Sequence, residues 1–156
     1  MEKNKKEIEI LNDLLKINND RVEGYLKAAD EVDDSELNKV FIDMAGVSRG
    51  MVIALTREIS TLGGDADLES TTNAGKIYRV WMDVRNTFSG KDTETALKSC
   101  EFGEDAAQNA YESALENQLP DYIESLIMTQ KSTLKDCHDL IKSKRDEVIR
   151  MDKQIR

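Results

Sequence analysis

The chain has 156 residues, of which 22 are basic and 31 acidic, so its net charge at pH 7 is −9. This length suits one domain, and we expect a single domain over residues 1–156. One proline, eight glycines and 39% apolar residues argue against an all-β fold and against a disordered acidic tail. The acidic balance argues against binding to nucleic acid and against attraction to an anionic membrane surface.

Apolar residues recur at spacings of three and four in the first part of the chain, which predicts two amphipathic helices. The first is expected from about Asn4 to Val32, and its mixed charges are not those of a secretion signal. The second is expected to begin at Ser35, whose hydroxyl can cap a helix. It is expected to end at Gly63 and Gly64, since glycine commonly follows the last helical residue.

Three further helices are expected after this point. A shorter amphipathic segment runs from Ile77 to Phe88, and a long helix runs from about Asp92 to Gln118. The last helix begins near Pro120, because proline is tolerated in a first helical turn. The four long helices would each span about 40 Å. Their apolar stripes can be buried against one another, so the sequence predicts an all-α four-helix bundle.

The connections predict how the helices are arranged. Short turns join the first long helix to the second and the third to the fourth, so each pair is expected to be antiparallel. About 28 residues separate the second from the third, including the shorter helix. This connection can reach roughly 50 Å, enough to cross the bundle height. A long crossover of this kind is typical of ferritin-like topology, and the alternative is an up-down bundle with an extra helix at one end.

A polar residue interrupts each apolar stripe: Asn18, Ser48, Glu104 and Gln130. Helices that span one bundle have their midpoints at similar heights, so we expect these four side chains to form one buried layer. A buried Glu104 needs a partner because an unpaired buried charge is very costly. Arg21, one turn after Asn18, is the natural candidate, since its guanidinium stays charged and offers several donors.

Other core residues surround this predicted layer. Tyr25 and Tyr111 bring hydroxyl groups toward it from about two turns away. Cys100 and Cys137 form no disulfide framework, so we expect two reduced, buried thiols in a cytoplasmic protein. Trp81 is expected to pack the crossover helix onto the bundle. Four methionines are expected to fill gaps in the core: Met44, Met51, Met82 and Met128.

Five segments together resemble a known family: LNDLLKINNDRVEGYLKAADE (Leu11–Glu31), FIDMAGVSRGMVIALTREISTLGG (Phe41–Gly64), KIYRVWMDVRNTFSGKD (Lys76–Asp92), CEFGEDAAQNAYESAL (Cys100–Leu115), and the last helix with Gln130 and His138-Asp139. They resemble the uncharacterised bacterial ferritin-like four-helix-bundle proteins, a family labelled as a domain of unknown function. The resemblance covers nearly the whole chain. The wider ferritin-like superfamily implies a dinuclear metal site with Glu on two helices and Glu-x-x-His on the other two.

Carried over position by position, most of the implied metal ligands fall on other residue types. The implied positions are Asn18, Ser48, Met51, Glu104, Gln130 and Thr133. Glu104 alone among them is a carboxylate. Hard divalent metals need several carboxylate or imidazole ligands, so we expect no metal cofactor, with Glu104 as the one candidate ligand.

His138 is the single histidine of the chain. If Glu104 lies level with Gln130, His138 lies about 12 Å further along the bundle axis. Its expected partners are then Glu94 or Glu101, near the start of the third long helix. A hydrogen-bonded structural histidine is favoured over a metal-binding or catalytic one.

These observations favour a cytoplasmic bundle whose metal site has degenerated into a polar layer. It would act as a non-enzymatic binding or stress-associated structural module. The alternative is a metal-binding oxidoreductase or metal-storage protein that uses Glu104 with Gln130, Tyr25 or Tyr111. A third hypothesis is a module that binds a small ligand or a protein through the crossover around Trp81. The sequence leaves homo-oligomerisation open and identifies no partner.

Overall fold

The computed structural model describes residues 2–66, 81 and 93–155. Its four helices are α1 (Glu2–Glu31), α2 (Ser35–Thr61), α4 (Thr93–Leu115) and α5 (Asp121–Ile155). The described residues include no strand, so for this part of the chain the all-α prediction is confirmed. A search of the same residues finds no helix that is long and apolar enough to cross a membrane.

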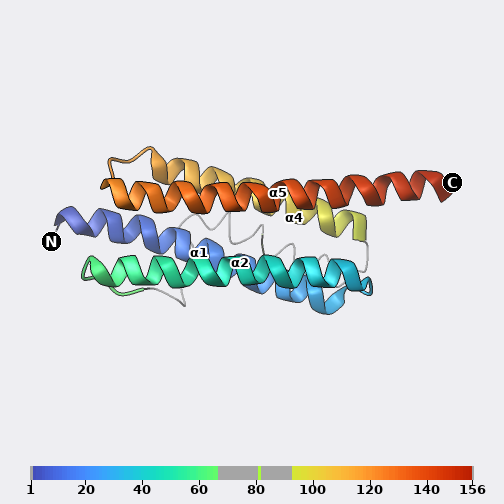
Figure 1. The fold of residues 1–156 in the computed structure, drawn as a ribbon, viewed down its shortest axis with the longest axis horizontal. Helices are drawn as coiled ribbons and strands as arrows, with labels where there is room; N and C mark the ends of the chain where they lie inside the picture. The colour runs from blue at the N-terminus through green and yellow to red at the C-terminus, as the bar shows by residue number, and fades with distance from the viewer. Residues whose placement is uncertain (1, 67–80, 82–92, 156) are drawn as a thin grey trace.

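The helices form two antiparallel hairpins that lie side by side as a bundle (Figure 1). α1 pairs with α2, and α4 pairs with α5. Across the bundle α1 contacts α4 and α2 contacts α5. α2 ends at the end of the bundle where the N-terminus lies, and α4 begins at the opposite end. Except for Trp81, the helix expected over Ile77–Phe88 lies outside the described residues.

Local sequence explains where α2 begins and ends. Asp34, not Ser35, caps its N-terminus, because the carboxylate accepts two backbone N–H groups of the first turn at 2.8 and 3.1 Å. A negative charge also suits the positive end of the helix dipole. Gly63 has a φ of +84°, and the N–H of Gly64 donates to the carbonyl of Ile59 at 2.9 Å. This is a Schellman ending, as the glycine pair predicts.

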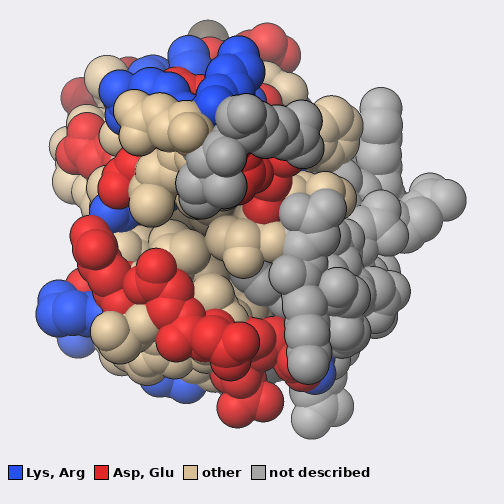
Figure 2. All heavy atoms as spheres, turned by 90° about the vertical axis from the view of Figure 1, so that its right-hand side faces the viewer, with Lys and Arg blue, Asp and Glu red and all other residues tan. Residues whose placement is uncertain are grey.

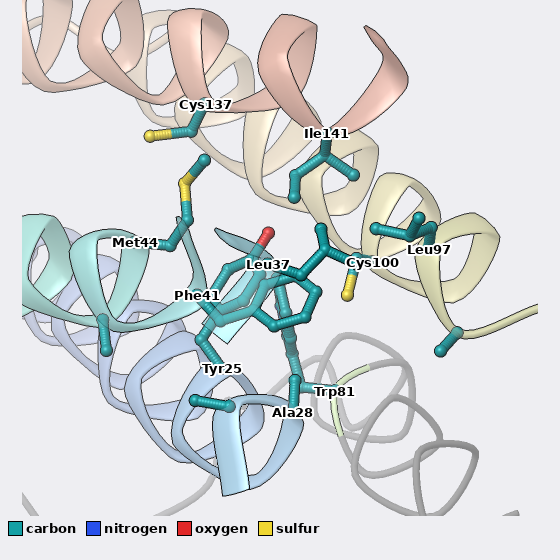
Figure 3. Packing of buried hydrophobic residues seen from close by; sticks show 13 residues of the cluster. Tyr25, Ala28, Leu37, Phe41, Met44, Trp81, Leu97, Cys100, Cys137 and Ile141 are labelled. Atoms are coloured by element: carbon teal, nitrogen blue, oxygen red, sulfur yellow. The ribbon is translucent and has the colours of Figure 1, made fainter. Parts of the chain in front are cut away.

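Two apolar clusters fill the bundle, one toward each end. The cluster near the α1–α2 turn is drawn in Figure 3 and includes Tyr25, Leu37, Phe41, Leu97, Cys100 and Ile141. The cluster toward the other end includes Leu11, Leu15, Leu55, Ile59, Ile123 and Ile127. The polar side chains described below lie mainly where the two clusters meet.

The predictions for both cysteines, Met44 and Met51 are confirmed, that for Met128 is wrong, and Met82 lies outside the described residues. Cys100 and Cys137 are free and buried. Met44 and Met51 are buried in the core. Met128 is 54% exposed on α5, so the prediction that it fills the core is wrong. The core-facing side of α5 is formed here by Ile123, Ile127 and Gln130, at spacings of four and three, and Met128 lies off this stripe.

Trp81 lies in a slot between α1 and α4, made by two glycines. A Cβ on Gly24 would lie 2.8 Å from the indole Cε3, and a Cβ on Gly103 would lie 2.8 Å from Cζ2. The ring fits because both positions lack a side chain. It also contacts the Tyr25 ring at a centroid distance of 5.3 Å (Figure 3). Trp81 is buried, which confirms that it packs onto the bundle.

Charges are segregated at the end of the bundle that contains the α1–α2 turn. Figure 2 shows acidic side chains gathered below, on the α1–α2 side, and basic side chains above, on the α5 side. The turn itself carries exposed Asp33 and Asp34. Lys144 of α5 joins the two sides through Glu36 at 2.8 Å, and this hydrogen bond raises the pKa of Lys144. An ion pair this open to solvent adds little stability.

Candidate functional site

A buried ion pair joins α1 to α4 near the middle of the bundle. Arg21 Nε donates to Glu104 Oε1 at 2.6 Å, and Arg21 Nη2 donates to Glu104 Oε2 at 3.0 Å. The two side chains are 0% and 1% exposed. The paired, two-point geometry is the strongest that arginine makes with a carboxylate. Each buried charge therefore has the partner that its removal from water requires.

From Arg21 a chain of hydrogen bonds passes through side chains of all four helices. Arg21 Nη1 donates to the hydroxyl of Ser48, and Ser48 donates to Asn18 Oδ1 at 2.9 Å. Asn18 Nδ2 donates to the hydroxyl of Tyr111 at 2.8 Å. Tyr111 donates to Gln130 Oε1 at 2.7 Å. These five residues and Glu104 are called the polar network below.

The guanidinium sets the direction of every bond in this chain. Arginine has no acceptor atom, so Ser48 must accept from Arg21 and has its own proton left for Asn18. Asn18 Oδ1 therefore accepts from Ser48, which leaves the Asn18 amide group to donate to the Tyr111 hydroxyl, and Tyr111 in turn donates to Gln130. The side-chain amide of Gln130 donates to the backbone carbonyl of Met51 at 3.4 Å, and the series of hydrogen bonds ends there. Bonds that all run one way strengthen one another in a low-dielectric core.

Burial fixes the protonation of the arginine and the tyrosines. Burial alone would lower the pKa of Arg21, but the Glu104 carboxylate outweighs it and holds this pKa above its usual value. Burial raises the pKa of Tyr111 despite an opposing hydrogen bond from Asn18. Burial and the Glu104 charge raise the pKa of Tyr25 well above its usual value. None of these three groups titrates near neutral pH, where a general acid or base must work.

The two core thiols are protonated as well. Burial, reinforced by the Glu104 charge, raises the pKa of Cys100 well above its usual value. Burial also raises the pKa of Cys137, although Arg21 opposes this shift. The thiolate is the nucleophile and the metal ligand, so protonated buried thiols are unreactive.

Tyr25 contacts the network through its ring. The guanidinium carbon of Arg21 lies 5.2 Å from the Tyr25 ring centroid and 5.9 Å from that of Trp81. Both rings attract the buried cation through cation–π interactions. The Tyr25 hydroxyl has no hydrogen-bond partner within the described part of the chain. Tyr25 therefore covers the ion pair without extending the chain of hydrogen bonds.

The polar network is staggered along the bundle, unlike the level layer that the sequence predicts. His138 of α5 lies beside Asp105 of α4, so Glu104 is nearly level with His138. Gln130 lies eight residues before His138, on the order of 12 Å away along the axis. It is within reach of Tyr111, which connects it to the rest of the network.

His138 lies outside the polar network. Its Nε2 is 2.8 Å from Asp105 Oδ1, and its Nδ1 is 3.0 Å from the carboxylate of the following residue. The expected partners, Glu94 and Glu101, are wrong, because the two helices pair in a different register. Glu101 is instead paired with Arg145. The histidine thus ties α5 to α4 at the bundle edge.

The residues at the bundle centre do not fit a dinuclear metal site. Both oxygens of Glu104 are engaged by Arg21, and the positive charge of Arg21 opposes a second cation at the same place. The amide of Asn18 and the hydroxyl of Ser48 are engaged within the network. Over residues 2–66, 81 and 93–155, no three His, Cys, Asp or Glu side chains are grouped to hold a metal ion.

A groove of about 520 Å³ runs between α4 and α5 beside His138. Four of its charged lining residues pair with one another, and Lys135 pairs with Asp139 outside the lining. Asp105 is paired with His138, and Lys131 lies 3.6 Å from Glu112. A binding site needs polar groups that converge on a ligand. These groups are directed at each other, so we do not assign the groove a ligand.

Replacing Tyr111 by phenylalanine tests the chain of hydrogen bonds. The ring is kept, but Gln130 Oε1 loses its donor, while Asn18 Nδ2 retains only the carbonyl of Leu14. We expect the free energy of unfolding to fall by roughly 1–3 kcal/mol, the cost of unsatisfied buried polar groups. The measurement is urea denaturation followed by circular dichroism. Tyr122→Phe, on a 52% exposed side chain, is the matched control; equal losses in the two variants would contradict the prediction.

Comparison with known families gives a match over most of the chain. The model of a family described as a Domain of unknown function (DUF2383) matches residues 6–117. The matched range covers most of α1 and all of α2 and α4, and it includes Arg21, Ser48, Glu104 and Tyr111. No curated protein matches the sequence.

Proposed function

The chain belongs to the family described as a domain of unknown function (DUF2383), and from this premise we propose that it is a non-enzymatic, ferritin-like module. In this proposal the polar network replaces the metal centre of ferritin-like proteins. The chain forms one domain over residues 1–156 and serves in the cytoplasm as a binding or stress-associated structural protein. The uncharacterised bacterial ferritin-like proteins that the sequence resembles motivate this assignment.

The observation that carries the proposal is the complete engagement of Glu104. Its two oxygens accept hydrogen bonds from Arg21 at 2.6 and 3.0 Å. A metal ion would have to displace the guanidinium from a buried site, where leaving either charge unpaired is strongly destabilising. The charges of Arg21 and Glu104 thus neutralise each other, which favours a structural role for the pair.

The positions of the helix ends support a ferritin-like topology. α2 ends at one end of the bundle and α4 begins at the other (Figure 1). A connection between these points has to travel the length of the bundle. A single long crossover between two helical hairpins is the topology of ferritin-like folds.

The alternative, a metal-binding oxidoreductase or storage protein, would join Glu104 to Gln130, Tyr25 or Tyr111. Within the network, Tyr111 and Gln130 are bonded to each other. Arg21 forms an ion pair with the carboxylate of Glu104 and also lies against the ring of Tyr25. These contacts favour the structural role over the altered ligand set.

Metal loading distinguishes the two functions. The protein is purified without chelator, incubated anaerobically with Fe²⁺ or aerobically with Mn²⁺, desalted, and analysed by mass spectrometry for bound metal. We expect far less than one metal ion per chain, and the same value for Glu104→Gln. Stoichiometric metal that is lost in Glu104→Gln would overturn the proposal. Oxygen consumption by the Fe²⁺-loaded protein above a protein-free blank, also lost in this variant, would establish the oxidoreductase.

A further inference from the structure

The outward face of α2 carries exposed apolar side chains. Ile42 is 49% and Ile53 is 61% exposed. Both lie opposite the buried positions of α2, such as Met44 and Leu55, that face the bundle. Gly46 and Gly50, also exposed, lie between the two isoleucines on this face. We call these four residues, together with Asp43 and Arg57 at their edges, the α2 outer face.

The two glycines of this face have no packing partner among the residues that the structure describes. A Cβ built on Gly46 or Gly50 meets no atom within 4 Å. By contrast, Gly24 and Gly103 make room for the Trp81 ring. Glycine inside a helix is less favourable than alanine by about 1 kcal/mol. Close approach of another helix backbone would account for two glycines on one exposed face.

The charges of the α2 outer face are complementary to those of an antiparallel copy. Asp43, Gly46, Gly50, Ile53 and Arg57 follow one another at spacings of three and four, which is the seam of a helix pair. Asp43 and Arg57 are each seven residues from Gly50, on opposite sides. In two antiparallel helices related by a two-fold axis at Gly50, each Asp43 therefore lies opposite Arg57 of the other copy.

The two charges at the ends of this seam remain available for such a pairing. Asp43 contacts Lys39 on its own helix at 3.1 Å, in an exposed pair that contributes little. Arg57 is exposed and forms no ion pair with any residue that the structure describes. Acid near the start of the seam and base near its end favour the antiparallel orientation and disfavour the parallel one.

We propose that the α2 outer face is the contact between two copies of this chain, antiparallel about a two-fold axis at Gly50. The two Gly50 residues face each other at the axis and each Gly46 lies opposite Ala54, so the backbones can approach closely and the isoleucines lose exposure. Two Asp43–Arg57 pairs close the ends, as expected for a self-complementary contact. The proposal does not depend on the polar network or on the function proposed above.

The contact is small, because it involves one helix from each copy. We expect the surface area that it buries to fall below the roughly 1,600 Å² of a typical stable interface. The two Arg49 side chains also lie near each other at one edge and oppose association. We therefore expect a reversible, concentration-dependent dimer.

Sedimentation equilibrium over a series of protein concentrations tests the proposal. The wild-type chain should shift from monomer to dimer by about 1 mM, and Gly50→Glu should weaken the dimer at least about tenfold. Glutamate forms helix better than glycine, so this variant should unfold at an equal or higher temperature, which separates lost association from lost folding. Tyr122→Glu, at an exposed position on α5 rather than on the face, should dimerise like the wild type. A monomer at every concentration, or a dimer indifferent to Gly50→Glu, would overturn the proposal.

A charge exchange tests the orientation of the two copies. Asp43→Arg and Arg57→Asp should each weaken the dimer, because each places like charges opposite one another. The double variant restores opposite charges and should return the affinity to within a few fold of the wild type. A double variant as weak as the single variants would exclude the antiparallel arrangement about Gly50.

Discussion

Replacement of Arg21 by methionine is expected to lower the free energy of unfolding by about 3–5 kcal/mol. Methionine is similar in length and unbranched, so the space remains largely filled. Glu104, at 1% exposure, would then be buried without its partner. Ser48 would also lose the donor that directs the hydrogen bonds of the polar network. The measurement is urea denaturation with the slope of the transition compared between variants.

Two further variants make this prediction specific to the buried charge. The double variant Arg21→Met with Glu104→Leu leaves neither charge in the core and should be more stable than Arg21→Met alone. Lys135→Met removes a cation from an exposed pair with Asp139 and should cost less than about 1 kcal/mol. A loss of under about 0.5 kcal/mol for Arg21→Met would show that the pair contributes little to folding.

The helices and the central ion pair could be predicted from the sequence because both follow from local rules. Spacings of three and four set which residues of a helix face the core. Glu104 falls on such a position, and a buried carboxylate requires a cation. Arg21 lies on the core-facing side of another helix, so the pair follows from two positions that can each be assigned separately.

The register between α4 and α5 could not be predicted in this way. Periodicity shows which residues face inward but not how far one helix slides along the next. Equal heights for Glu104 and Gln130 were expected from helix midpoints, but α5 extends further than α4 and displaces its midpoint. The expected partners of His138 were wrong for the same reason. The cap at Asp34 shows the smaller error of one residue that is usual at helix ends.

The slot around Trp81 was missed, although the sequence contains a signal for it. Gly24 and Gly103 each interrupt a long helical pattern, and such a glycine usually has a packing reason. The ring that each one accommodates comes from a segment far away in the sequence. Sequence patterns on α1 and α4 could therefore indicate that space is needed there, but not which side chain fills it.

Replacement of Trp81 by alanine is expected to lower the free energy of unfolding by roughly 3–5 kcal/mol, because it empties a slot whose walls are helix backbone. Gly24 and Gly103 have no side chains that could move inward, and the Arg21 guanidinium would lose one of its two aromatic neighbours. Chemical denaturation measures the loss, with Tyr122→Ala at an exposed site as the control.

A second variant tests the same slot by adding a methyl group to one of the glycines that border the Trp81 ring. Gly103→Ala improves helix propensity, yet its Cβ would lie 2.8–3.0 Å from three indole atoms, so we expect a net loss of about 1–3 kcal/mol. Trp81 is the single tryptophan, so its fluorescence reports the ring directly, and displacement toward water should shift the emission to longer wavelength. If Gly103→Ala stabilised the protein with unchanged emission, the ring would not be held by this wall. The slot would then not explain why α4 carries a glycine next to Glu104.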